Sequence, residues 1–145
     1  MTFRFETLLK LRKNAENLEQ REMAEIQNHL YARQNELQDL NSTGAKNKEE
    51  LQTRLQQSIP GRTLDLYDRY FQSMGHRSGL QEQIILETSE KVKAKRTELV
   101  EAMRKRRVLE ILKDRDILKK KRKVLKDENA LMDEIASTRW QMRNL

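Results

Sequence analysis

The last 66 residues of the chain, Leu80 to Leu145, contain neither glycine nor proline. They are rich in Lys, Glu, Leu, Arg and Ala, which are all good helix formers. An uninterrupted run of this kind predicts one long helix. A chain of 145 residues cannot enclose such a helix in a globular core. We therefore expect it to pack against a second long helix.

The residues that break helices are confined to the middle of the chain. They are Gly44, Pro60, Gly61, Gly75 and Gly79. Pro60–Gly61 is the strongest break, because proline lacks a backbone donor and glycine tolerates left-handed dihedral angles. We expect Gly44 to interrupt the first helix, and Thr63 to cap the second.

The expected organisation is a single coiled-coil domain over residues 1–145. Helix one is expected at about 2–57, the break at 58–62, and helix two at about 63–143, with a weak point at 75–79 where it could kink. A short connection reverses the direction of the chain. The expected fold is therefore all-α, a long antiparallel two-helix hairpin.

Apolar residues recur every three or four positions in both halves, which is typical of a coiled coil. In the first half the expected seam is Leu8, Leu11, Ala15 and Leu18, then on a shifted frame Ile26, Leu30, Leu37 and Leu40. The shift falls at Glu22–Met23. In the second half it is Leu99, Ala102 and Leu109, then, after a frame change near Lys113, Val124, Leu131, Ile135 and Met142. Three basic residues lie on or next to this seam: Lys95, Arg106 and Lys113.

No arrangement of residues predicts catalysis. The chain has no cysteine, no phosphate-binding glycine loop and no nucleophile elbow. His29 and His76 lack partners at metal-ligand spacing, so neither a metal nor another cofactor is expected. The opening residues do not resemble a secretory signal, and no apolar run is long enough to span a bilayer. The composition therefore indicates a non-enzymatic, cytoplasmic protein.

The net charge of +7 comes from one stretch. Residues 91–126 hold sixteen basic and five acidic side chains, whereas the rest of the chain is neutral or slightly acidic. Such a local excess attracts an acidic surface or a polyanion. Nucleic acid or an anionic membrane is one alternative partner, although residues 91–126 contain no aromatic, Asn or Gln side chain to read bases. A merely solvated helix face is the other.

Aromatic side chains gather just after the break. Tyr67, Tyr70 and Phe71, followed by Met74, have the spacing of one helical face. They are either a local core at the closed end of the hairpin or a docking face, since Tyr and Phe often anchor interfaces.

The sequence resembles the FliJ family of flagellar type III export. The similar segments are the opening Phe3–Arg12, the central Tyr67–Phe71, Glu98–Ala102 with Arg106–Glu110, and Met132–Ala136 near the end. The resemblance implies a coiled coil like the γ-subunit stalk of rotary ATPases, placed in the ring of the export ATPase FliI. It also implies contact with the membrane gate protein FlhA, binding of export chaperones, and peripheral association with the flagellar base. Injectisome stalk proteins have the same layout and remain an alternative.

The resemblance also implies roles for individual residues. Tyr67, Tyr70, Phe71 and Met74 become the expected gate-binding face. The expected ATPase-binding residues are the two ends of the hairpin, thought to lie together, and the basic stretch: Phe5, Leu8, Leu11, Arg12, Arg104, Arg106, Arg107, Asp133 and Arg139.

Overall fold

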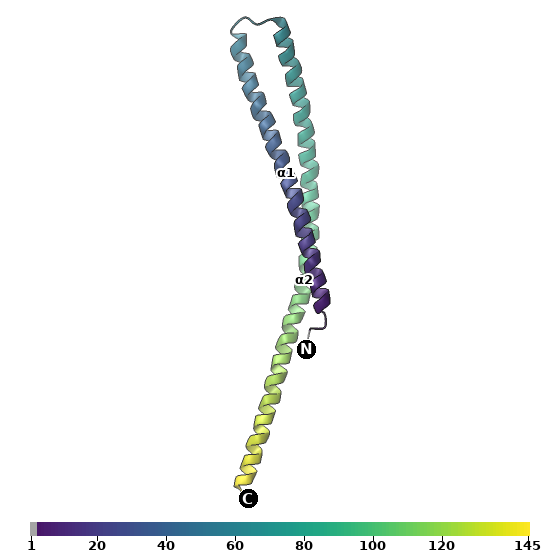
Figure 1. The fold of residues 1–145 in the computed structure, drawn as a ribbon, viewed down its shortest axis with the longest axis vertical. Coiled ribbons are helices and arrows are strands. Elements are labelled where there is room, and N and C mark those ends of the chain that lie inside the picture. Colours follow the sequence, from purple (N-terminus) through teal and green to yellow (C-terminus); the bar gives the residue numbers. More distant parts are fainter. Residues whose placement is uncertain (1–2) are drawn as a thin grey trace. The chain divides into compact units, whose positions relative to one another are not determined.

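The structure, a computed structural model, describes residues 3–145. It consists of helix α1, Glu6–Leu55, and helix α2, Gly61–Arg143, joined by residues 56–60 (Figure 1). The two helices contain 50 and 83 residues, and no strand occurs in the described part of the chain. The expected all-α hairpin is therefore confirmed.

The helix ends follow from backbone hydrogen bonding. The expected start of helix one at about residue 2 lies outside the described residues, and α1 begins at Glu6 after a turn. At the start of α2 the carbonyl of Pro60 accepts bonds from the backbone N–H groups of Thr63, at 3.1 Å, and Leu64, at 3.3 Å. Pro60 thus occupies the capping position and Thr63 lies inside the first turn. The prediction that Thr63 caps the helix was wrong.

The glycines do not interrupt the helices. α1 runs through Gly44, and α2 runs through Gly75 and Gly79, and none of these glycines has a positive φ. Gly44 lies half-buried on the seam, where an added Cβ would be 4.0 Å from the Met74 Cε atom. The expected interruption at Gly44 is wrong, because packing against the facing helix outweighs the low helix propensity of one glycine.

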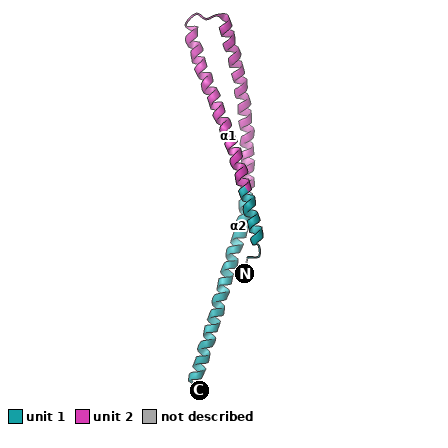
Figure 2. Ribbon diagram, viewed as in Figure 1, with its two compact units in different colours: residues 1–17, 101–145 teal, residues 18–100 magenta. Residues whose placement is uncertain are grey.

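The chain forms two compact units, shown in different colours in Figure 2. In the second unit, Leu18–Val100, the two helices run antiparallel and are joined by residues 56–60 at the closed end of the hairpin (Figure 2). The buried side chains of this unit are Met23, Met74, Thr88 and Val92. The expected seam residues Ile26, Leu30, Leu37 and Leu40 are half-buried beside them, as is Leu99.

The first unit combines residues up to Asn17 with Glu101–Leu145. Leu9, Leu109 and Glu16 are its buried side chains, with Leu9 only 1% exposed. The expected seam residues Leu8 and Leu11 are instead 37% and 61% exposed, and Ala15 is exposed as well. Leu18, the first residue of the other unit, is also exposed. The seam on α1 therefore follows Leu9 and Glu16, and this part of the heptad prediction was wrong.

The frame shift expected at Glu22–Met23 is absent. Counting back from Ile26 by threes and fours gives Met23, Glu19, Glu16, Arg12 and Leu9, and every one of these side chains is buried or half-buried. The frame change expected near Lys113 is also absent, because Lys113, Asp116 and Lys120 are half-buried and continue the spacing of Leu109. Charged side chains occupy several seam positions. A heptad assignment based on apolar residues alone omits these positions and therefore predicts frame changes that the structure does not contain.

Beyond Lys120 the helix α2 has no partner within its unit. Every residue from 121 to 145 is exposed, including the expected seam residues Val124, Leu131, Ile135 and Met142. We call residues 121–145 the C-terminal segment. Helix α2 therefore extends past the beginning of α1. The two ends of the hairpin do not lie together as expected, because Glu6 pairs with Lys113 and the segment containing Asp133 and Arg139 continues alone.

Candidate interaction site

Three basic side chains of α2 reach across the seam to glutamates of α1. They are Lys95, Arg106 and Lys113, the residues that sequence analysis places on or next to the seam. In each case the acid comes from α1 and the base from α2. We call these contacts the charged rungs of the hairpin.

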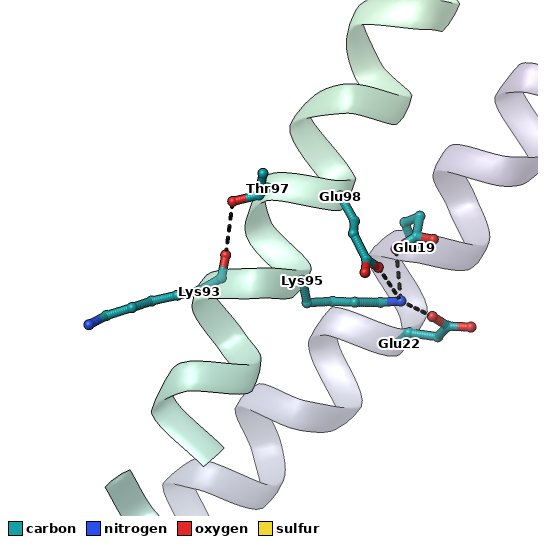
Figure 3. Close-up of polar contacts among 6 residues, drawn as sticks. All are labelled: Glu19, Glu22, Lys93, Lys95, Thr97 and Glu98. Carbon is teal, nitrogen blue, oxygen red and sulfur yellow. Dashed lines mark hydrogen bonds and ion pairs between the residues drawn. The ribbon is translucent and has the colours of Figure 1, made fainter. Parts of the chain in front are cut away.

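The Lys95 rung lies in the second unit and is drawn in Figure 3. The Lys95 ammonium is 2.8 Å from Glu19, 3.1 Å from Glu98 on its own helix, and also paired with Glu22. Only 15% of the Lys95 side chain is exposed. Hydrogen bonds to Glu19, then to Glu22 and Glu98, raise the pKa of Lys95 despite its partial burial. The ammonium is therefore charged at neutral pH.

The other two rungs lie in the first unit. The Arg106 guanidinium pairs with the buried Glu16, and it lies 2.7 Å from Glu110 one turn along α2. Hydrogen bonding to Arg106 lowers the pKa of Glu110, and the bonds to Glu110 and Glu16 raise the pKa of Arg106. The Lys113 ammonium is 3.0 Å from Glu6. Because a buried carboxylate must be paired, these contacts specify which faces of the two helices meet.

A groove lies where α1 begins and α2 continues alone. It has a volume of about 770 Å³. Its apolar lining comes from Phe3, Ile117, Val124 and Leu125. Its charged rim carries the paired Lys113 and Glu6, the Lys120–Asp116 pair at 2.8 Å, and Lys121. We call it the N-terminal groove.

The aromatic residues lie at the closed end of the hairpin. Phe71 lies against both tyrosines, with ring centroids 6.3 Å from Tyr67 and 5.3 Å from Tyr70. Tyr70 is hydrogen-bonded to Asn47 of α1, and the Arg54 guanidinium lies 5.9 Å from the centre of the Tyr67 ring. Met74 is buried. This arrangement favours a local core, and the half-buried Tyr67 and Phe71 still present part of their surface.

The expected ATPase-binding residues have different surroundings. Phe5, Leu8 and Leu11 are exposed on α1, and Arg104 is exposed on α2. Arg106 instead points into the seam, and exposed Arg107 lies 3.4 Å from Glu110. Arg12 is half-buried. Asp133 and Arg139 are exposed in the C-terminal segment, so the structure brings them together with none of the others.

Sequence reasoning missed the acidic half of each rung, namely Glu6, Glu16 and Glu19. A signal was available, because a basic residue at a seam position of one helix needs an acid at the facing position of the other. It also missed Leu9, which is adjacent to the more conspicuous Leu8 and Leu11.

The described residues contain no group of three or more His, Cys, Asp or Glu side chains that could hold a metal ion. Neither helix, over residues 3–145, has an apolar stretch sufficient to cross a membrane. The surfaces that remain are the C-terminal segment, the N-terminal groove and the aromatic end. The fold is that of a two-helix coiled-coil protein, and these three surfaces are suited to contacts with other macromolecules.

The chain belongs to the FliJ family, since the family described as "Flagellar FliJ protein" matches residues 1–145. The protein is thus a component of flagellar protein export. No curated protein and no solved structure shows a significant match to the chain.

Proposed function

We propose that this protein is a non-catalytic coiled-coil stalk that inserts into the ring of the flagellar export ATPase, FliI, and promotes its assembly and activity. The observation that carries the proposal is the C-terminal segment, in which every residue is exposed. A helix inside a ring meets several subunits at once, so it needs contact groups on all sides. A helix packed in a hairpin has one side occupied.

The charge of the C-terminal half supports this role. The basic residues Lys119, Lys121, Arg122 and Lys123 point in different directions, because successive helical residues are separated by about 100°. Arg104 and Arg139 add exposed cations on either side of this group. Such a rod can form charge pairs with acidic loops of neighbouring subunits. Arg106 does not contribute, because it is held by Glu16 and Glu110.

The test of the stalk is ATP hydrolysis by the cognate ring with and without this protein, at about 0.05 and 0.5 M salt. We expect stimulation that is larger at low salt and that is reduced by charge reversal at Arg104 and Arg139. Arg62→Glu is the matched control, because Arg62 is also an exposed arginine and lies near the closed end. Circular dichroism confirms that each variant is folded. No stimulation at either salt concentration contradicts the stalk function.

Contacts with the export gate FlhA and with export chaperones complete the proposed function, at the flagellar base on the cytoplasmic side of the inner membrane. The gate contact is assigned to the aromatic end, where Tyr67 and Phe71 are half-buried and Leu64 and Leu66 are exposed. We expect Phe71→Ala with Tyr67→Ala to weaken gate binding, with Leu86→Ala, an exposed leucine elsewhere on α2, as the control. Normal gate binding by a folded double variant would place the contact elsewhere.

A further inference from the structure

The C-terminal half of α2 carries an apolar stripe with no partner. Its members are Ile117, Leu118, Val124, Leu125, Leu131, Met132 and Ile135, all between 42% and 67% exposed. Their spacing places them on one side of the helix. The stripe begins in the N-terminal groove, which Ile117, Val124 and Leu125 line together with Phe3. A contiguous apolar surface of this kind marks an interaction site.

The charge around the stripe changes sign along the helix. Residues 119–126, the basic block, hold six basic and no acidic side chains. Residues 127–134, the acidic block, hold four acidic and no basic side chains. The groove contains part of the basic block, because Lys120 and Lys121 are on its rim. It therefore suits a helix that is apolar on one side and acidic at its edges.

The chain itself supplies such a helix. The exposed sequence Asp127-Glu-Asn-Ala-Leu-Met-Asp-Glu-Ile135 combines Leu131, Met132 and Ile135 with the four carboxylates of the acidic block. It cannot fold back into its own groove, because α2 is continuous from Gly61 to Arg143. A second copy of the chain can present it.

We propose that in the free protein, before the stalk enters the ring, two copies associate antiparallel through residues 117–135, each placing its acidic block against the basic block and N-terminal groove of the other. In this register Ile117 of one copy faces Ile135 of the second, and the two-fold axis passes through residue 126, so the Leu125 side chains of the two copies lie close to it. Lys121 lies near Glu128, and Lys120 near Glu134. A two-fold axis makes every contact occur twice. A parallel pair would instead set six cations against six cations.

The charge pattern also favours a second copy of the chain over an anionic membrane as the partner of this surface. Glu128 lies within the apolar stripe, and the other carboxylates of the acidic block lie along it. A negatively charged surface would repel them and gain nothing from the acidic block. A second copy pairs both blocks at once.

Sedimentation equilibrium of the full chain tests the association, at about 1 to 100 µM and low salt. We expect a reversible dimer. Lys121→Glu or Glu128→Lys alone should raise the dimer dissociation constant about tenfold, since each change affects two exposed charge pairs. The combined charge swap should return it to within about twofold of the original. Leu86→Glu, in the other unit, is the control and should leave the dimer intact.

Disulfide trapping tests the orientation, because the chain has no cysteine of its own. A mixture of Ile117→Cys and Ile135→Cys chains should form a mixed disulfide on mild oxidation, and neither variant alone should cross-link efficiently. Cross-linking of Ile117→Cys with itself would indicate a parallel pair and overturn the proposal. A chain that remains monomeric at the highest concentration, with normal helicity, would overturn it as well.

Discussion

Replacing Leu9 by alanine tests which residues of α1 form the seam. Leu9 is 1% exposed, so the change removes three carbon groups from a fully buried site. At about 0.8 kcal/mol for each group, the loss of burial alone costs about 2.4 kcal/mol. The space left behind adds a little more, for a total of about 3 kcal/mol. Helix propensity contributes almost nothing, since alanine and leucine are both strong helix formers.

The matched control is Leu11→Ala, the same chemical change two residues away. Leu11 is 61% exposed, and less than half of the same burial free energy is at stake, about 1 kcal/mol. The measurement is urea unfolding of both variants and the unchanged protein, followed by circular dichroism. If Leu11→Ala destabilises the protein as much as Leu9→Ala, the seam follows the leucines expected from sequence and the burial argument fails.

Three further predictions concern other parts of the seam. Gly44→Ala should stabilise the protein by about 1 kcal/mol in urea unfolding, because the new methyl group meets Met74 at ordinary contact distance and alanine favours the helix; destabilisation would mean that the site has no room. Glu110 should contribute stability that is lost as the pH falls through its lowered pKa, because the folded state binds this proton less tightly than the unfolded state. Thermal melts between about pH 3 and 7 should therefore show a shallower acid loss for Glu110→Gln, and identical slopes would contradict this. Lys95→Glu should open the Glu19 rung by setting like charges together, seen as lower helicity, whereas Lys93→Glu, on an exposed side chain, should not.

The sequence was sufficient to predict the hairpin but not its seam. The Pro60–Gly61 break and the long run free of glycine and proline determine two helices and a reversal, because these are local properties of the chain. The heptad frame near the N-terminus, in contrast, depends on contacts between residues that are far apart in the chain. Leu8 and Leu11 are as apolar as Leu9, and the choice among them depends on which face carries Glu16 toward Arg106.

The interaction surfaces were predicted less well for the same reason. The spacing of Tyr67, Tyr70 and Phe71 indicated a common face, but only the facing helix, with Asn47 and Arg54, shows that this face is partly a core. Arg106 was expected both next to the seam and among the ATPase-binding residues, and its ion pairs with Glu16 and Glu110 place it in the seam. Arg104 is exposed, as expected for the basic stretch, but the C-terminal segment is exposed throughout, although its Val124, Leu131 and Ile135 were expected in the seam.

The first unit holds the beginning of α1 with very little apolar burial. Leu9 and Leu109 are its buried apolar residues, and ion pairs of Glu6 and Glu16 with Lys113 and Arg106 cross the seam beside them. Ion pairs near the surface weaken as ionic strength rises, and stability is not uniform within a protein. We therefore expect the first three turns of α1 to unfold from their free end before the rest of the chain melts, and to do so at lower temperature as the ionic strength rises. Such unfolding separates Arg106 and Lys113 from their partners on α1, Glu16 and Glu6, and leaves both cations of α2 facing solvent.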